Sequence, residues 1–125
     1  MGQKNKILII DDEKHLAALI KLNLEHTGKY EVSVAHDGEE GLKKVTQEAP
    51  HLIILDLILP KLTGEEVCKK IRRDEKTEKI PIIMVTAKAS TADVIIGKVI
   101  GANHYITKPF QMNDLLKSIE EVLSR

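Results

Sequence analysis

Short apolar runs alternate with helical patterns along the whole chain, and this alternation limits the possible folds more than any other feature of the sequence. The strand-like runs lie at 7–10, 30–35, 52–55, 82–85 and 105–106. Apolar residues at helical spacing follow each run, at 16–24, 42–49, 67–71, 91–100 and 112–123. A repeated strand–helix unit with short connections predicts an α/β domain, in which helices cover both faces of a parallel sheet.

The pattern inside each run predicts where its strand lies in the sheet. The runs at 7–10, 52–55 and 82–85 are unbroken and apolar, which is typical of parallel strands buried on both faces. The run at 30–35 alternates apolar and polar residues instead. We therefore place this second strand at an edge of the sheet.

Two residues mark expected helix ends, and one helix has a clear apolar stripe. Gly28 is the expected stop of the first helix, and Asp37 is the expected cap of the second. The first helix is expected to bury a stripe of four apolar residues: Leu16, Leu19, Ile20 and Leu24.

Length and composition narrow the class of protein. A chain of 125 residues predicts one domain, spanning 1–125. Lys and Arg total 19, and so do Asp and Glu, which argues against a nucleic-acid-binding surface. The single cysteine excludes an intramolecular disulfide and favours a reducing compartment. The first apolar run is too short for a signal peptide or a membrane span, so we expect a cytoplasmic protein without a membrane partner.

Charged and hydroxyl side chains follow the strands at the end where chemistry collects in open parallel sheets. Asp11 and Asp12 follow the first strand, Asp56 the third, Thr86 ends the fourth and Lys108 follows the fifth. Grouped carboxylates repel each other, and a hard divalent cation relieves this repulsion. Because the cluster is oxygen-only, it favours Mg²⁺.

This set of residues suits phosphoryl transfer to a carboxylate. Asp56 can attack a phosphoryl donor as a nucleophile and form an acyl phosphate. The metal ion and Lys108 would balance the charge on the phosphoryl oxygens, and Thr86 offers a short hydrogen-bond donor to one of them.

Two other kinds of α/β domain need residues that this chain lacks. A flavin- or dinucleotide-binding domain needs glycines after the first strand, where this chain has Asp11, Asp12 and Glu13. A haloacid-dehalogenase-type phosphatase needs a second Asp two residues after the nucleophile, where this chain has Ile58. Each acidic or basic residue taken alone could be a helix cap or an ordinary loop residue. Their joint placement at one sheet edge favours the phosphoryl acceptor, which would not be a turnover enzyme.

Four stretches resemble the receiver domain of bacterial two-component response regulators, and the resemblance covers nearly the whole chain. They are 9–13 (IIDDE), 55–60 (LDLILP) with Gly64, 85–87 (VTA) and 101–110 (GANHYITKPF). The resemblance implies a flavodoxin-like (βα)₅ fold with strand order 2-1-3-4-5. It also implies that a histidine kinase or a histidine phosphotransfer protein donates the phosphoryl group to Asp56.

Further roles follow from the resemblance alone. Mg²⁺ would be held by Asp11, Asp12, Asp56 and the backbone carbonyl of Ile58. Lys108 would bind the phosphoryl group, and its bond to Pro109 would be cis. Thr86 and Tyr105 would form a switch pair that changes the face made by the fourth helix, fifth strand and fifth helix. That face would regulate an effector protein or an output domain.

Several expectations stay open at this level. Ile58 and Lys88 occupy positions that tune the lifetime of the phosphorylated state, and an apolar Ile58 predicts slow hydrolysis. The weakly charged helix at 91–100, with Val94, favours a phosphorylation-dependent homodimer or an effector contact, or has no partner at all. The alternative function is a receiver-fold scaffold that binds proteins without accepting phosphate; the intact acidic residues, Thr86 and Lys108 argue against it.

Overall fold

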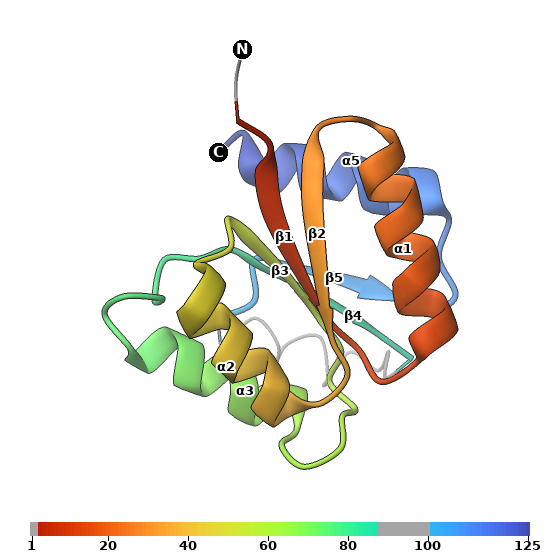
Figure 1. Ribbon diagram of the computed structural model, residues 1–125. Coiled ribbons are helices and arrows are strands. Elements are labelled where there is room, and N and C mark those ends of the chain that lie inside the picture. Colours follow the sequence, from red (N-terminus) through yellow and green to blue (C-terminus); the bar gives the residue numbers. More distant parts are fainter. Residues whose placement is uncertain (1–2, 88–100) are drawn as a thin grey trace.

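The computed structural model describes residues 3–87 and 101–125 (Figure 1). Strands and helices alternate as expected from the first strand to the fourth, and the fifth strand is followed by a helix. The elements are β1 (Asn5–Ile10), α1 (Lys14–His26), β2 (Tyr30–Ala35), α2 (Gly38–Glu48), β3 (Leu52–Leu55), α3 (Gly64–Arg73), β4 (Ile82–Thr86), β5 (His104–Thr107) and α5 (Met112–Leu123). The helix expected at 91–100, with Val94, and the tuning residue Lys88 lie outside the described residues.

The five strands form one parallel sheet in the order β2-β1-β3-β4-β5, so the predicted flavodoxin-like fold is confirmed. The alternating strand β2 lies at an edge, as predicted. β1 and β3 pair so that Ile10 lies opposite Leu55. The residues that follow these two strands therefore emerge next to each other, and the N–H of Asp56 donates to the carbonyl of Ile10 at 3.0 Å.

Successive residues of the central strands point to opposite faces, and each face has its own core. Ile7 and Ile9 belong to a cluster with residues of α1 and α5, whereas Leu8 and Ile10 belong to a cluster with residues of α2 and α3. Figure 1 shows the same three layers, with α1 and α5 on one side of the sheet and α2 and α3 on the other. Cys68 lies fully buried in the second cluster, as its position on the helix stripe predicts.

Both expected helix ends are confirmed, but the prediction that Leu19 belongs to the buried stripe of α1 is wrong. Gly28 follows α1 with a φ of 78°, and Asp37 caps α2 by accepting a hydrogen bond from the N–H of Glu40. Leu19, however, is 50% exposed. The buried stripe of α1 consists of Ala17, Ile20 and Leu24, and Leu19 lies one residue, or about 100°, around the helix from Ile20.

No helix within the described residues is both long and apolar enough to cross a membrane.

Candidate functional site

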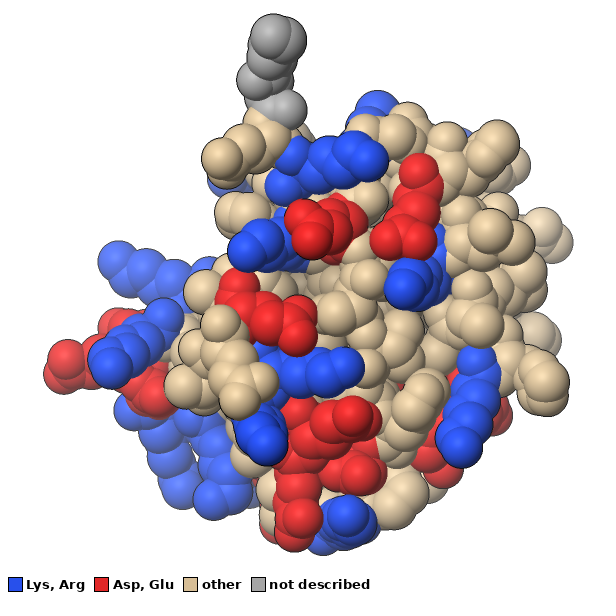
Figure 2. Space-filling model, in the orientation of Figure 1, with Lys and Arg blue, Asp and Glu red and all other residues tan. Residues whose placement is uncertain are grey.

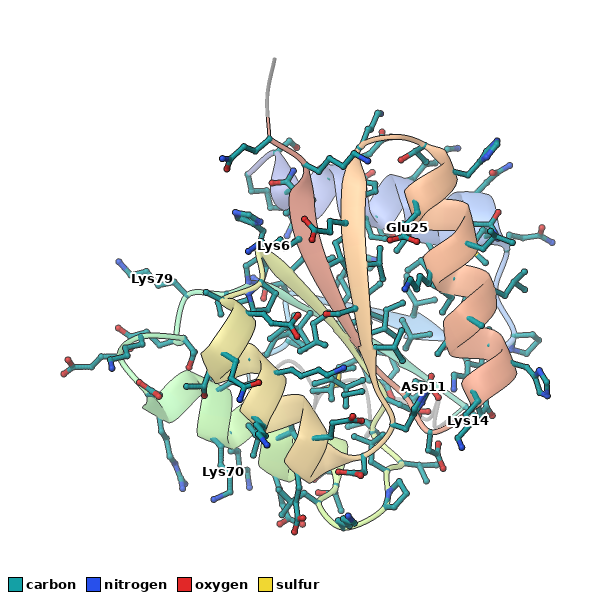
Figure 3. All side chains as sticks on the ribbon, viewed as in Figure 1. Lys6, Asp11, Lys14, Glu25, Lys70 and Lys79 are labelled. Carbon is teal, nitrogen blue, oxygen red and sulfur yellow. The ribbon has the colours of Figure 1, made fainter. Side chains whose placement is uncertain are left out.

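Three aspartates meet where β1 and β3 end. Asp11 and Asp12 follow β1, and Asp56 follows β3; a carboxylate oxygen from each lies within 4.8 Å of the others. Asp11 and Asp56 are nearly buried, whereas Asp12 is exposed. Figure 3 shows Asp11 at the end of β1, beside the start of α1. The pairing of adjacent strands thus brings together carboxylates that are 45 residues apart in the sequence (56 − 11).

The side chain of Lys108, which follows strand β5, contacts this group of carboxylates. Its Nζ donates to Asp56 Oδ2 at 2.8 Å, to Asp11 Oδ2 at 3.0 Å and to Glu13 Oε2 at 3.0 Å. The backbone holds the lysine in place, since its N–H donates to the carbonyl of Thr86 at 2.9 Å. The Lys108–Pro109 bond is cis, as the resemblance implied. The ammonium therefore reaches into the aspartate cluster from β5.

The burial of these charges changes their proton affinities. Burial raises the pKa of Asp11, although the hydrogen bonds from Glu13 N–H and from Lys108 act in the opposite direction. Burial alone would lower the pKa of Lys108, but its hydrogen bonds to Asp56, Asp11 and Glu13 raise that pKa above its ordinary value. One ammonium therefore does not fully offset the cost of burying the Asp11 carboxylate. A divalent cation among the same oxygens would offset more of it.

The loop between β3 and α3 is held close to Asp56. The N–H of Ile58 donates to Asp56 Oδ1 at 3.1 Å, and the N–H of Gly64 donates to the carbonyl of Leu57 at 2.9 Å. A Cβ on Gly64 would lie 2.1 Å from the carbonyl oxygen of Asp56, so only glycine allows this approach. The Ile58 side chain is 57% exposed, beside the cluster and outside the core.

The expected switch pair lies on the two strands next to Lys108. Thr86 is fully buried at the end of β4, and Tyr105 is half-buried on β5, where it packs against the α2–α3 core. Thr86 pairs in register with Thr107, the residue before Lys108. The pairing of β4 with β5 therefore places Thr86 on the strand next to the one that carries Tyr105 and leads to Lys108.

Glu13 is a site residue that was not singled out from the sequence. It occupies the N-cap position of α1, but its side chain makes no capping hydrogen bond; instead it contacts Lys108. Neither Asp11 nor Asp12 is the cap of this helix, although Asp11 Oδ1 accepts from the N–H of Glu13 at 2.9 Å. The available signal was a third consecutive acidic residue after the first strand.

An apolar groove opens beside Lys108. Its lining includes Leu16 and Leu19 of α1, Phe110 and Met112, together with the charged residues Glu13 and Lys108. Leu22, one turn along α1 from Leu19, is 67% exposed. The groove therefore places apolar side chains directly beside the charged site.

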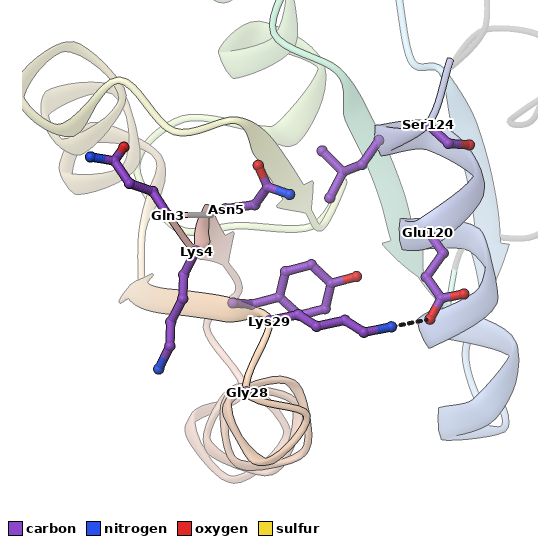
Figure 4. Close-up of a pocket in the computed structure, with 9 residues that line it drawn as sticks. Gln3, Lys4, Asn5, Gly28, Lys29, Glu120 and Ser124 are labelled. Carbon is purple, nitrogen blue, oxygen red and sulfur yellow. Dashed lines mark hydrogen bonds and ion pairs between the residues drawn. The ribbon is translucent and has the colours of Figure 1, made fainter. Parts of the chain in front are cut away.

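A second hollow lies at the opposite end of the sheet. Figure 4 shows its lining between the start of β2 and the end of α5, with Lys29 Nζ 3.2 Å from Glu120 Oε1. This ion pair is exposed, so it contributes at most about 1 kcal/mol to stability. The face shown in Figure 2 carries both basic and acidic side chains, and the acidic ones gather at the lower centre of the view.

Comparisons with known proteins match this architecture. A family model described as "Response regulator receiver domain" matches residues 7–120. The alkaline phosphatase synthesis transcriptional regulatory protein PhoP of Bacillus subtilis is 45% identical over 120 residues, covering 96% of this chain and 49% of that protein. Response regulator ArlR of Staphylococcus saprophyticus is also 45% identical, covering 96% and 53%. The chain thus spans about half the length of these curated relatives.

Solved structures agree. A putative response regulator from Chloroflexus aurantiacus superposes with a TM-score of 0.93 at 35% identity, covering 98% of this chain and all of that one (100%). A CheY-like response regulator receiver domain protein from Methanospirillum hungatei superposes with a TM-score of 0.90 at 35% identity, covering 98% and 95%.

Proposed function

The chain belongs to the response regulator receiver domain family of two-component systems, and we propose that Asp56 is its phosphoryl acceptor. The observation that carries the proposal is the environment of this carboxylate. Asp56 is 5% exposed, yet it lies at the sheet edge with Asp11, Asp12 and the Lys108 ammonium around it. A buried carboxylate with acidic neighbours and one cation is suited to bind a metal ion and to react as an anionic nucleophile. It has no evident role in packing the core.

The donor set fits Mg²⁺. Asp11, Asp12 and Asp56 supply carboxylate oxygens close enough to share one cation, and hard oxygen ligands suit this ion. The backbone carbonyl of Ile58 completes the proposed set. When bound, the ion would neutralise charge on the phosphoryl oxygens and orient them.

The remaining chemistry belongs to the chain's own side chains. A carboxylate oxygen of Asp56 attacks the phosphorus of a phosphohistidine; the new O–P bond forms as the P–N bond breaks, and the imidazole leaves with the electron pair. Lys108 stabilises the charge on the transferred group. The proposed role of Thr86 is to donate its hydroxyl to a phosphoryl oxygen.

The proposed readout is a shift in conformation. Phosphorylation adds about 1.5 to 2 negative charges beside Lys108, which favours the conformer that brings Thr86 towards the phosphoryl group and turns Tyr105 inward. The face of β5 and α5, with the helix expected at 91–100, would then change its affinity for an effector, an output domain or a second copy of the chain.

The proposed partners follow from the groove and the relatives. A histidine kinase or phosphotransfer protein would pack on Leu16, Leu19, Phe110 and Met112, because this groove lies directly beside Lys108. One relative is named as a transcriptional regulator, and an output of that kind is proposed for a longer protein containing this domain. The proposed setting is the cytoplasm, and the proposed role is a phosphorylated switch spanning residues 1–125, not a turnover enzyme.

The test is incubation with acetyl phosphate followed by intact-mass measurement. With Mg²⁺, we expect the mass of one added phosphoryl group, whereas with excess EDTA we expect none, because the acidic site needs its cation. Borohydride reduction followed by peptide mapping should place the modification at Asp56. No mass gain with Mg²⁺ would favour the alternative, a scaffold that binds partners without accepting phosphate.

The exposed Ile58 predicts a long-lived phosphorylated state. Its side chain cannot orient an attacking water, whereas an amide at this position can. One added hydrogen bond of about 1 kcal/mol in the transition state corresponds to roughly fivefold, so Ile58→Asn should shorten the phosphate half-life by about that factor. Dephosphorylation is followed by intact mass after removal of the donor.

Ile58→Leu is the matched control, since it keeps an apolar side chain and should leave the half-life unchanged. Equal half-lives for the native chain and Ile58→Asn would show that the side chain at this position does not control hydrolysis.

A further inference from the structure

Lys108 has no spare hydrogen bond for an incoming phosphoryl group. An ammonium has three N–H donors, and three carboxylates, from Asp56, Asp11 and Glu13, lie within 3.0 Å of Lys108 Nζ. Contact with a phosphoryl oxygen therefore requires that one of these carboxylates is released.

The three partners are not held equally. The side chains of Asp11 and Asp56 are 3% and 6% exposed, and each accepts a second hydrogen bond from a backbone N–H. The Glu13 side chain is 58% exposed. Its carboxylate can move into water without leaving a buried charge unpaired, so Glu13 is the partner that Lys108 releases most easily.

Helix capping does not explain the position of this side chain. Glu13 is the N-cap residue of α1, where a side-chain oxygen usually accepts from a backbone N–H of the first turn. Its side chain makes no such bond and lies against Lys108 instead.

Glu13 also lies in the groove beside Lys108. It lines the apolar groove together with Lys108, Leu16 and Phe110. An anion that comes close to Lys108 therefore also comes close to the negative charge of Glu13, and repulsion between like charges slows its approach.

We propose that Glu13 is a positioning residue that occupies the third N–H of Lys108 before phosphorylation and holds back phosphoryl donors that do not dock on the protein. This inference rests on the proposed function, because it concerns the rate at which Asp56 is modified. A donor protein seated in the groove contacts Glu13, which lines it, and displaces its carboxylate from Lys108. A small donor has no such contact.

The experiment compares initial rates of phosphorylation by acetyl phosphate, measured by intact mass at Mg²⁺ concentrations that saturate each variant. Glu13→Gln keeps the size of the side chain and removes its charge. An ion pair with one exposed partner is worth about 0.2–1 kcal/mol, so we expect a rate about 1.5- to 5-fold above that of the native chain. The difference should narrow as salt is added, because screening weakens the same charge in the native chain.

Glu39→Gln is the matched control. Glu39 is also an exposed glutamate at the start of a helix and also lies near a lysine, with 3.9 Å between its Oε2 and Lys61 Nζ. Its substitution should leave the rate unchanged. A Glu13→Gln rate equal to or below the native rate, or an equal gain in Glu39→Gln, would overturn the role of Glu13. Absence of any mass gain in the native chain would instead overturn the proposed function.

Discussion

Replacing Asp56 by asparagine should abolish phosphorylation by acetyl phosphate and Mg²⁺ while leaving the fold intact. The amide nitrogen is no nucleophile, and the amide oxygen carries too little charge to attack phosphorus. The oxygen can still accept the hydrogen bond that Asp56 Oδ1 now receives from the N–H of Ile58. Lys108 also keeps its contacts with Asp11 and Glu13, so no buried charge is left alone.

Two measurements check this expectation. Intact mass should show no added phosphoryl group in Asp56→Asn, and the free energy of unfolding should stay within about 1 kcal/mol of the native value. Asp74→Asn, at an exposed aspartate that follows α3, is the control and should be phosphorylated as the native chain is. An undiminished mass gain in Asp56→Asn would place the acceptor elsewhere.

Replacing Gly64 by alanine should damage both stability and phosphorylation. The new Cβ would lie 2.1 Å from the carbonyl oxygen of Asp56 and 2.6 Å from Leu57 Cα. Both are backbone atoms, so neither can move aside without shifting the loop that follows β3. Overpacking of this kind costs about 1–3 kcal/mol. Because the displaced loop carries Asp56 and Ile58, we also expect slower phosphorylation at saturating Mg²⁺.

Gly28→Ala separates loop displacement from simple loss of a glycine. Gly28 has a φ of +78° and no neighbouring atom within 4 Å of an added Cβ, so its substitution should cost about 1–2 kcal/mol through backbone strain alone. Urea unfolding should show a loss of stability in both variants, but only Gly64→Ala should be phosphorylated slowly. A native phosphorylation rate in Gly64→Ala would show that the loop does not need this close approach.

Most of the fold could be predicted because the sequence pattern and the tertiary structure share one physical cause. Unbroken apolar runs such as 52–55 require burial on both faces, and that requirement places them in the centre of a parallel sheet. The alternating run at 30–35 tolerates water near one strand and lies at an edge. Leu19 shows where this reasoning fails: its spacing matched the apolar stripe expected on α1, but the buried residues of that helix are Ala17, Ile20 and Leu24, and Leu19 is exposed.

The functional site, like the fold, could be predicted from the sequence only in part. Asp11, Asp12, Asp56 and Lys108 could be brought together in advance, because parallel strands end at the same edge. The hydrogen-bond and ion-pair partners of each of these side chains could not be predicted from the sequence. Glu13 was visible only as one more acidic residue after the first strand, and its contact with Lys108 depends on how α1 starts and how far the lysine reaches.

By itself, the sequence determined the class of fold, the sheet edge at which the functional side chains lie and the carboxylate that follows the buried third strand. Local patterns of apolar and polar residues are sufficient for this, because they reflect burial and strand direction. Only the tertiary structure decided which carboxylates share the Lys108 ammonium, how closely Gly64 approaches the backbone of Asp56 and that Leu19 of α1 faces water. Those features depend on distances of a few ångströms between segments that are far apart in the chain, and no local pattern encodes them.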